Sequence, residues 1–219
     1  MIFDVDGTLV DSNDAHARAW LQAFADHGIT VAYEPVRRAI GMGGDKLMPL
    51  VAGIDEDSAI GKQIGERRAK ILQQSWLPTL RPFPRTRELV QLLSDRGYTL
   101  TIATSAKEGE LHPLLDVAAV SDLFPTRTSS DDADKSKPDP DIVKAALERA
   151  RCPADRTIMI GDTPYDIEAA HRAHVRVIAL ECGGWRRVDL RDADEVYRDS
   201  SDLLDRYEES ILAKLSRAA

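Results

Sequence analysis

Short apolar runs recur along the chain and alternate with segments whose apolar positions have helical spacing. The runs occupy residues 1–5, 98–103, 123–128, 157–160 and 175–180. Between them, residues 89–93 and 142–150 place apolar side chains on one face of a helix, and Gly97 and Pro153 follow as breakers. Short strands that alternate with helices predict an α/β fold with a parallel sheet covered on both faces.

Residues 13 to about 80 break this alternation, because their apolar positions suit helices and no run is typical of a strand. We predict a helix from Ser12 or Asn13 to Gly28, another from Pro35, and two more over 45–52 and 58–75. The simplest organisation is an all-helical cap domain, residues 13–81, inserted into a Rossmann-like core of residues 1–12 and 82–219. Pro82 and Pro84 suit a stiff connection between the two parts.

The two ends of the chain carry weaker signals. Only three apolar residues precede Asp4, which is short for a strand and leaves open whether the natural chain begins upstream of Met1. Near the other end, apolar positions predict one C-terminal helix that serves packing, with Leu203, Leu204, Tyr207, Ile211 and Leu215.

Charge and cysteine content narrow the class of protein. The 219 residues include 29 basic and 37 acidic side chains, a net charge of −8, which disfavours nucleic acid or an anionic membrane as partner. The two cysteines form no metal-binding or disulfide pattern. No apolar run has the length of a membrane span, and the N-terminus lacks the pattern of a signal peptide. We expect a cytoplasmic enzyme.

Polar side chains follow the predicted strands, at the edge of the sheet where ligands of open α/β folds bind. In chain order they are Asp4, Asp6, Thr104, Ser105, Lys137, Asp162 and Asp166. Carboxylates gathered there would repel one another unless a cation joined them, and hard oxygen ligands suit Mg²⁺. A hydroxyl, a lysine and the backbone amides of the turn at Gly7 could then hold a phosphate.

Four sequence elements in this order resemble the haloacid dehalogenase-like superfamily, in particular its aspartate-nucleophile phosphatases and phosphomutases. They are "DVDGT" at 4–8, Thr104 after "TLTIA", Lys137 in "KPDPDI", and "GDTPYD" at 161–166. The resemblance covers nearly the whole chain. "DxDG" also begins calcium loops, but the further ligands of an EF-hand are missing from this sequence.

The resemblance implies a role for each matching residue. Asp4 would be the nucleophile that forms an aspartyl-phosphate, and Asp6 would protonate the leaving oxygen and later deprotonate water. Thr104 and Lys137 would hold phosphoryl oxygens. The resemblance further implies Mg²⁺ as cofactor, held by Asp4, Asp162 and the backbone carbonyl of Asp6. Asp166 would be a further ligand or fix the waters of the metal, or it would be only an acid favoured in the first turn of a helix.

The predicted cap contributes further candidates. "DSNDAHARAW" resembles the cap hinge of β-phosphoglucomutase, so His16 is either a substrate-site residue or a hinge residue, while Trp20 is expected in the core. Lys46, in the glycine-rich "IGMGGDKLM", would meet a second anionic group or lie in solvent. Arg67 and Arg68 could point into the cleft, but we expect them on a solvated helix face.

Three functions remain open. The first is a Mg²⁺-dependent phosphatase that acts on a small phosphorylated metabolite, a sugar phosphate or phosphoglycolate. The second is a β-phosphoglucomutase-like phosphomutase, which the glycines of the predicted cap loop make less favourable because a mutase grips a bisphosphate. The third, a non-catalytic binding protein, would be expected to lose Asp4 or Lys137, and both are present. We expect a monomer or weak dimer.

Overall fold

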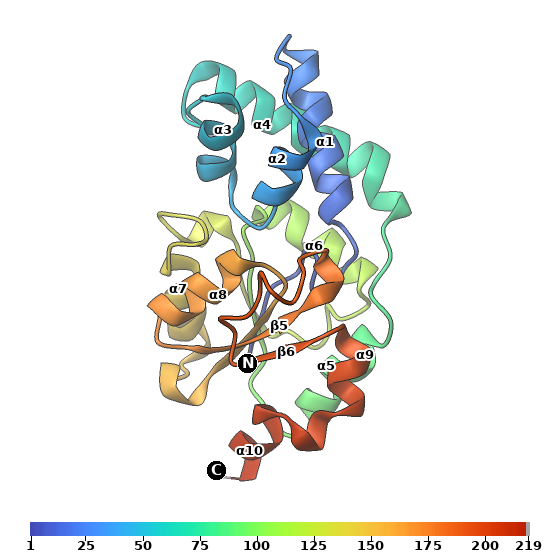
Figure 1. Ribbon diagram of the computed structural model, residues 1–219, viewed down its shortest axis with the longest axis vertical. Coiled ribbons are helices and arrows are strands. Elements are labelled where there is room, and N and C mark those ends of the chain that lie inside the picture. Colours follow the sequence, from blue (N-terminus) through green and yellow to red (C-terminus); the bar gives the residue numbers. More distant parts are fainter. Residues whose placement is uncertain (218–219) are drawn as a thin grey trace.

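Six parallel strands form one sheet in the computed structural model, which describes residues 1–217 (Figure 1). Their order across the sheet is β3-β2-β1-β4-β5-β6. The chain therefore starts at the central strand β1, adds β2 and β3 on one side of it, and then returns to add β4, β5 and β6 on the other side. The strands are β1 (Ile2–Phe3), β2 (Thr101–Ala103), β3 (Thr126–Thr128), β4 (Ile158–Gly161), β5 (Arg176–Leu180) and β6 (Glu195–Tyr197). This is the arrangement of a Rossmann-like α/β fold.

Alternate side chains of the strands bury themselves on opposite faces of the sheet. Ile2 and Met159 pack into the apolar cluster beneath α7 (Asp141–Ala150) and α8 (Pro164–Arg172). Phe3 and Ile160 belong to the larger cluster on the other face, with α5 (Thr86–Asp95) and α6 (Glu108–Val117). Because both faces are covered, β1, β2 and β4 are buried along their whole length, whereas the edge strands β3 and β6 carry half-buried polar side chains.

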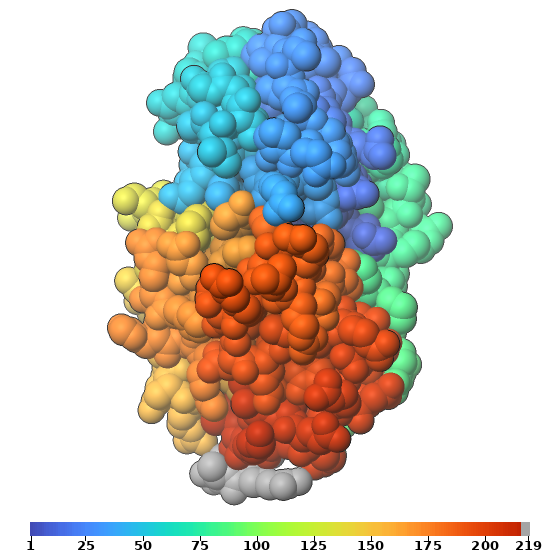
Figure 2. Space-filling view, in the orientation of Figure 1, coloured from blue at the N-terminus to red at the C-terminus, as the bar shows by residue number. Residues whose placement is uncertain are grey.

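Four helices gather at one end of the molecule, drawn in blue to teal in Figure 1, and we call them the helical lobe. They are α1 (Asn13–Asp26), α2 (Tyr33–Ala39), α3 (Gly44–Ala52) and α4 (Ala59–Ile71), the last continuing into a π-helical turn at Leu72–Trp76. All four fall where the sequence predicts helices. The space-filling view shows the lobe packed directly on the rest of the molecule (Figure 2), and lobe residues line a cavity together with Asp4 and Thr104, which follow β1 and β2.

The chain enters and leaves the helical lobe through two segments that run side by side. Val10 pairs with Pro82 as a β-bridge, and the amide of Asp11 donates to the carbonyl of Arg81 at 2.9 Å. These bonds tie the two crossings into one short hinge. The division of the chain into a cap domain at 13–81 and a core stays a prediction.

The C-terminal part differs from the expectation. The predicted single helix is wrong: it is split into α9 (Ser200–Asp205) and α10 (Ile211–Arg217), because Ser210 between them has an extended backbone. The sequence analysis also missed β6, a three-residue strand at the edge of the sheet that pairs with β5.

Candidate active site

Polar side chains converge at the carboxyl end of the central strand. Asp4 follows β1, Thr104 follows β2 and Asp162 follows β4, and these three strands are neighbours in the sheet. Strand order reverses at β1, and the crevice outside such a point is where open α/β sheets bind ligands. The topology thus brings together residues that lie up to 158 positions apart in the sequence.

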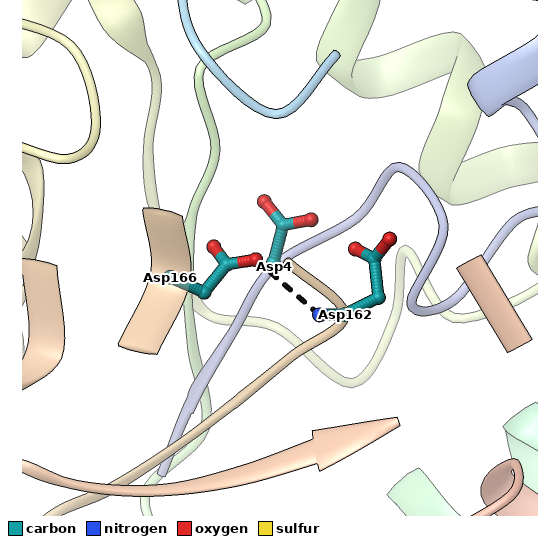
Figure 3. Close-up of side chains that lie close together, drawn as sticks. All are labelled: Asp4, Asp162 and Asp166. Atoms are coloured by element: carbon teal, nitrogen blue, oxygen red, sulfur yellow. Dashed lines mark hydrogen bonds between the residues drawn. The ribbon is translucent and has the colours of Figure 1, made fainter. Parts of the chain in front are cut away.

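Three buried carboxylates form the centre of the site. Asp4, Asp162 and Asp166 each offer an oxygen within 4.8 Å of the others (Figure 3). The ammonium of Lys137, itself fully buried, donates to Asp4 Oδ1 at 2.6 Å and to Asp166 Oδ1 at 2.7 Å. Within this cluster, three carboxylates face one ammonium, so a further cation would balance the charge.

Asp162 and Asp166 are held by neighbours that fix their orientation. Asp166 Oδ2 accepts from the amide and the hydroxyl of Thr163, at 3.0 and 2.7 Å, in a capping box that begins α8. Asp162 accepts from the hydroxyl of Thr8 at 3.1 Å and from the amide of Asn13 at 2.9 Å. The sequence analysis missed Thr8 and Asn13 in this role, although Thr8 stands inside the first motif.

Gly7 supplies space for the acidic cluster. Its φ is +76°, and a Cβ built there would lie 2.3 Å from Asp162 Oδ2 and 2.2 Å from Asn13 Nδ2. Its own amide donates to the carbonyl of Val10 at 2.8 Å, within the turn. The glycine is therefore required by the packing of Asp162, and its predicted contact with substrate stays a prediction.

The donor set fits Mg²⁺. Its ligands are carboxylate oxygens, which a hard divalent cation prefers, and they are buried in a shared position. Burial raises the pKa of Asp162 well above its usual value, with Asp166 and Asp4 adding to the effect. Burial likewise raises the pKa of Asp4 to about 7, although Lys137 opposes this. A divalent cation would reverse both shifts by stabilising the ionised forms.

Asp6 has a different environment from Asp4. Its Oδ1 lies 2.7 Å from His16 Nε2 and accepts from the Ser12 hydroxyl at 2.5 Å. Burial raises the pKa of Asp6, but His16 and Ser12 outweigh burial and hold the pKa below its usual range. His16 belongs to α1, so the helical lobe supplies a side chain that orients Asp6.

A small cavity of about 40 Å³ lies between the acidic cluster and the helical lobe. Asp4 and Asp6 line it from the core, and Trp20 and Arg68 line it from the lobe. The expectation that Arg68 lies on a solvated face is wrong, since its side chain is only 11 % exposed and pairs with Glu110 of α6. Arg67 does lie at the surface, paired with Asp26.

Comparisons with known proteins agree with this geometry. The profile of the family described as haloacid dehalogenase-like hydrolase matches residues 1–180. The chain belongs to this family. Phosphoglycolate phosphatase of Pseudomonas syringae pv. tomato is 30% identical over 84% of this chain and 69% of its own length. Pyrophosphatase PpaX of Oceanobacillus iheyensis is 26% identical over 82% of each chain. The crystal structure of a hydrolase from Pseudomonas syringae superimposes with a TM-score of 0.89 at 29% identity, covering 95% of this chain and 97% of the other.

As a haloacid dehalogenase-like hydrolase the protein is an enzyme, and its relatives carry the names of phosphoric monoester hydrolases and a pyrophosphatase. Thr104 and Ser105 line the cavity of this family member. The Thr104 hydroxyl accepts from the amide of Ala106 at 3.1 Å, and the Ser105 hydroxyl donates to the carbonyl of Gly41 in the helical lobe at 3.0 Å. Ser105 therefore joins core and lobe beside the site.

Lys46 lies outside the cavity of this haloacid dehalogenase-like hydrolase. Its ammonium pairs with Asp139 Oδ2 at 2.5 Å, which links α3 of the helical lobe to the segment before α7 in the core. Among residues 1–217, no hydrogen bond or ion pair joins it to Asp4 or Asp6. The predicted role of Lys46 in binding substrate stays a prediction, and its observed partner favours a contact between lobe and core.

The metal-free enzyme is expected to lose thermal stability as the pH rises from about 4 to about 7. The pKa values of Asp4 and Asp162 are higher in the folded protein than in the unfolded chain, where they are about 3.8. The stability that these two groups contribute is therefore fully present below pH 3.8. It is lost as the pH rises through the folded pKa, which is about 7 for Asp4. Mg²⁺ binds ionised carboxylates and should raise the melting temperature more at about pH 8 than at about pH 5.

Melting curves with EDTA and with Mg²⁺ at each pH measure this effect. Asp162→Asn should flatten the pH dependence and weaken the response to Mg²⁺. Asp11→Asn, at an exposed position near the hinge, is the matched control and should leave both unchanged. Equal stabilisation by Mg²⁺ across the pH range would contradict the assignment.

Proposed function

We propose that the protein is a Mg²⁺-dependent phosphatase that hydrolyses a small phosphorylated metabolite through an aspartyl-phosphate on Asp4. One observation carries the proposal: Asp4 lines the cavity while its Oδ1 is held by the buried ammonium of Lys137. A carboxylate fixed in this way faces the space where a phosphoryl group would lie, with a cation beside it that offsets the charge of both anions.

The first step is attack of Asp4 on phosphorus, which transfers the phosphoryl group to the carboxylate. Lys137 stabilises the charge on the transferred group, and Thr104 borders the same space. Asp4, Asp162 and the backbone carbonyl of Asp6 would hold Mg²⁺. Asp166 would ligate it or fix its waters, and its contacts with Lys137 and Thr163 favour the second role. The metal would supply positive charge between nucleophile and phosphate.

Asp6 is proposed as the general acid and base. It lines the same cavity as Asp4 and contacts His16 of the helical lobe. It would protonate the oxygen of the leaving group and then remove a proton from the water that hydrolyses the aspartyl-phosphate. His16 and Ser12 hold its carboxylate in place, so His16 is a positioning residue.

Release of inorganic phosphate from small phosphate monoesters tests the proposal. Turnover should require Mg²⁺, be lost in excess EDTA and return when Mg²⁺ is restored, whereas Ca²⁺ should inhibit because it takes more ligands and looser geometry. Full activity in excess EDTA would contradict the proposed role of the metal. Absence of phosphate release from every ester, with Mg²⁺ present, would contradict the phosphatase function itself.

A phosphomutase is the second candidate, favoured by the contact of His16 with Asp6 at the hinge. Against it, the loop at Gly41–Gly44 offers no basic side chain to a second phosphate, and Lys46 is paired elsewhere. The same assay separates the two functions when β-glucose 1-phosphate is supplied with its bisphosphate. We expect release of phosphate to exceed formation of glucose 6-phosphate, and the reverse would favour the mutase.

Among the described residues, no helix combines the length and apolar character needed to cross a membrane. We propose the cytoplasm as the place of action, since a small phosphate ester is met there, and the oligomeric state as monomer or weak dimer stays a prediction.

A further inference from the structure

An ion pair lines the cavity that also contains the side chain of Asp6, the proposed general acid. Both carboxylate oxygens of Glu110, in the first turn of α6, accept from Arg68 Nη1 of α4 at 2.7 and 2.6 Å. The Arg68 guanidinium lies over the Trp20 ring, 5.0 Å from its centroid. Arg68 and Glu110 line the cavity together with Asp6, and their side chains are 11 % and 12 % exposed.

The pair leaves hydrogen-bonding capacity unused. Arg68 Nε is buried and has no hydrogen-bond partner among the described residues. Glu110 receives both of its bonds from Arg68 through a single nitrogen, so each of its oxygens retains a lone pair. A buried donor without a partner is costly, and a group in the cavity that satisfies it would be stabilised.

A leaving group bound beside Asp6 would reach this pair, because Asp6, Arg68 and Glu110 line one cavity. Asp6, which would protonate the leaving oxygen, lines the same cavity, and the positive charge of Arg68 contributes to lowering the pKa of Asp6. The rest of the leaving group therefore lies among Asp6, Arg68 and Glu110. Its chemistry must suit a donor and an acceptor that stand side by side.

A hydroxyl suits this position and a carboxylate does not. A hydroxyl accepts from Arg68 and donates to Glu110, while a carboxylate accepts from Arg68 but is repelled by Glu110 and by Asp6. The charge of the Arg68 guanidinium is also already offset by Glu110, so it offers an anionic leaving group little net attraction.

We propose that Arg68 and Glu110 select a neutral, hydroxyl-bearing leaving group, so that the substrates are phosphate monoesters of polyols or sugars. Esters whose leaving group is anionic, such as phosphoglycolate and pyrophosphate, are disfavoured. This inference rests on the proposed phosphatase function and assigns its substrate class. The substrate class inferred for this chain therefore differs from the substrates that the names of the two curated relatives suggest.

Two probes that differ in one group measure the selection. The 2-hydroxyethyl phosphate molecule has CH₂OH where 2-phosphoglycolate has a carboxylate, so their reacting centres match. The wild type should favour 2-hydroxyethyl phosphate in kcat/KM by at least about tenfold, the order expected when a like charge faces a buried carboxylate.

Variants of Glu110 test whether its charge causes the difference in kcat/KM between 2-hydroxyethyl phosphate and phosphoglycolate. Glu110→Gln should lower the ratio of the two kcat/KM values by about tenfold, mainly by raising kcat/KM for phosphoglycolate. Glu110→Asp keeps the charge and should keep the preference. Glu108→Gln, at an exposed position on the same helix, is the matched control and should behave as the wild type. A merely structural pair would change both esters equally, so an unchanged ratio in Glu110→Gln overturns the inference, as does a wild type that prefers phosphoglycolate.

Binding separates this inference from the proposed function. Calorimetry with Asp4→Asn and Mg²⁺ should show tighter binding of 2-hydroxyethyl phosphate than of phosphoglycolate, without any turnover. Adding Glu110→Gln to Asp4→Asn should reduce the difference in affinity between the two esters. If the Glu110→Gln variant fails to fold, the ester preferences of Glu110→Asp and of the wild type still test the inference. Failure to hydrolyse any ester, p-nitrophenyl phosphate included, contradicts the phosphatase function, while the binding ratio still tests the selection.

Discussion

Asp4→Asn is expected to lower kcat by more than about a hundredfold, because it replaces the proposed covalent nucleophile with an amide. The fold should be unaffected, since asparagine has nearly the same shape and its carbonyl oxygen can still accept from Lys137 Nζ at the position of Asp4 Oδ1. Initial rates of phosphate release, with melting curves as a check of folding, measure the effect. Asp11→Asn, at an exposed position, should retain wild-type turnover.

The covalent step has its own readout. Rapid quenching during turnover, followed by borohydride reduction and mass spectrometry, should label Asp4 in the wild type, because borohydride reduces an acyl phosphate. Asp4→Asn should carry no label. Retention of more than about a hundredth of wild-type turnover by Asp4→Asn would mean that Asp4 is not the nucleophile.

Asp6→Ala is expected to slow hydrolysis of alkyl phosphate monoesters by roughly a hundredfold to ten-thousandfold, the usual contribution of general acid–base catalysis. An alkoxide needs a proton as it leaves, whereas p-nitrophenolate needs little, so the loss should be smaller with p-nitrophenyl phosphate. The Mg²⁺ affinity should change little, because the side chain of Asp6 is absent from the cluster of Asp4, Asp162 and Asp166.

The same variant distinguishes a phosphatase from a dehalogenase of the same fold. A halide leaves without a proton, so a dehalogenase needs no acid two residues after its nucleophile. An equal loss on both kinds of ester would mean that Asp6 mainly supports the site. Halide release from a 2-haloacid by the wild type would place the protein in another branch of the family. Ser201→Ala controls for general effects of substitution, because it removes a hydroxyl that donates to the carbonyl of Pro84 at the surface.

The sheet and the acidic cluster were predictable because their signals are local. Apolar runs mark five of the six strands, and each site acid directly follows a strand or begins the helix after it. Parallel topology then forces Asp4 and Asp162 together. The positions of the four lobe helices were equally readable, since Ser58 caps α4 through its own side chain and apolar spacing marks the rest.

The remaining features depend on contacts between distant segments. The pairing of Arg68 with Glu110 joins residues 42 positions apart on separate helices, and nothing near either residue marks it. The edge strand β6 is only three residues long and begins with the half-buried Glu195, so it lacks an apolar run. The break between α9 and α10 comes from the extended backbone at Ser210, whose hydroxyl bonds the carbonyl of Tyr207.

Beside the apolar cluster that includes residues of both parts, several contacts between the helical lobe and the core are polar. Arg68 pairs with Glu110, Lys46 pairs with Asp139, and Ser105 donates to Gly41. When such contacts part, water replaces each partner, so separation costs far less than exposing an apolar interface of the same extent. Mobile ions screen solvent-exposed charges that lie more than about 8 Å apart at physiological ionic strength, and they screen buried pairs much less. We therefore expect added salt to weaken the surface ion pairs of the protein more than the Arg68–Glu110 pair, whose side chains are only 11 % and 12 % exposed.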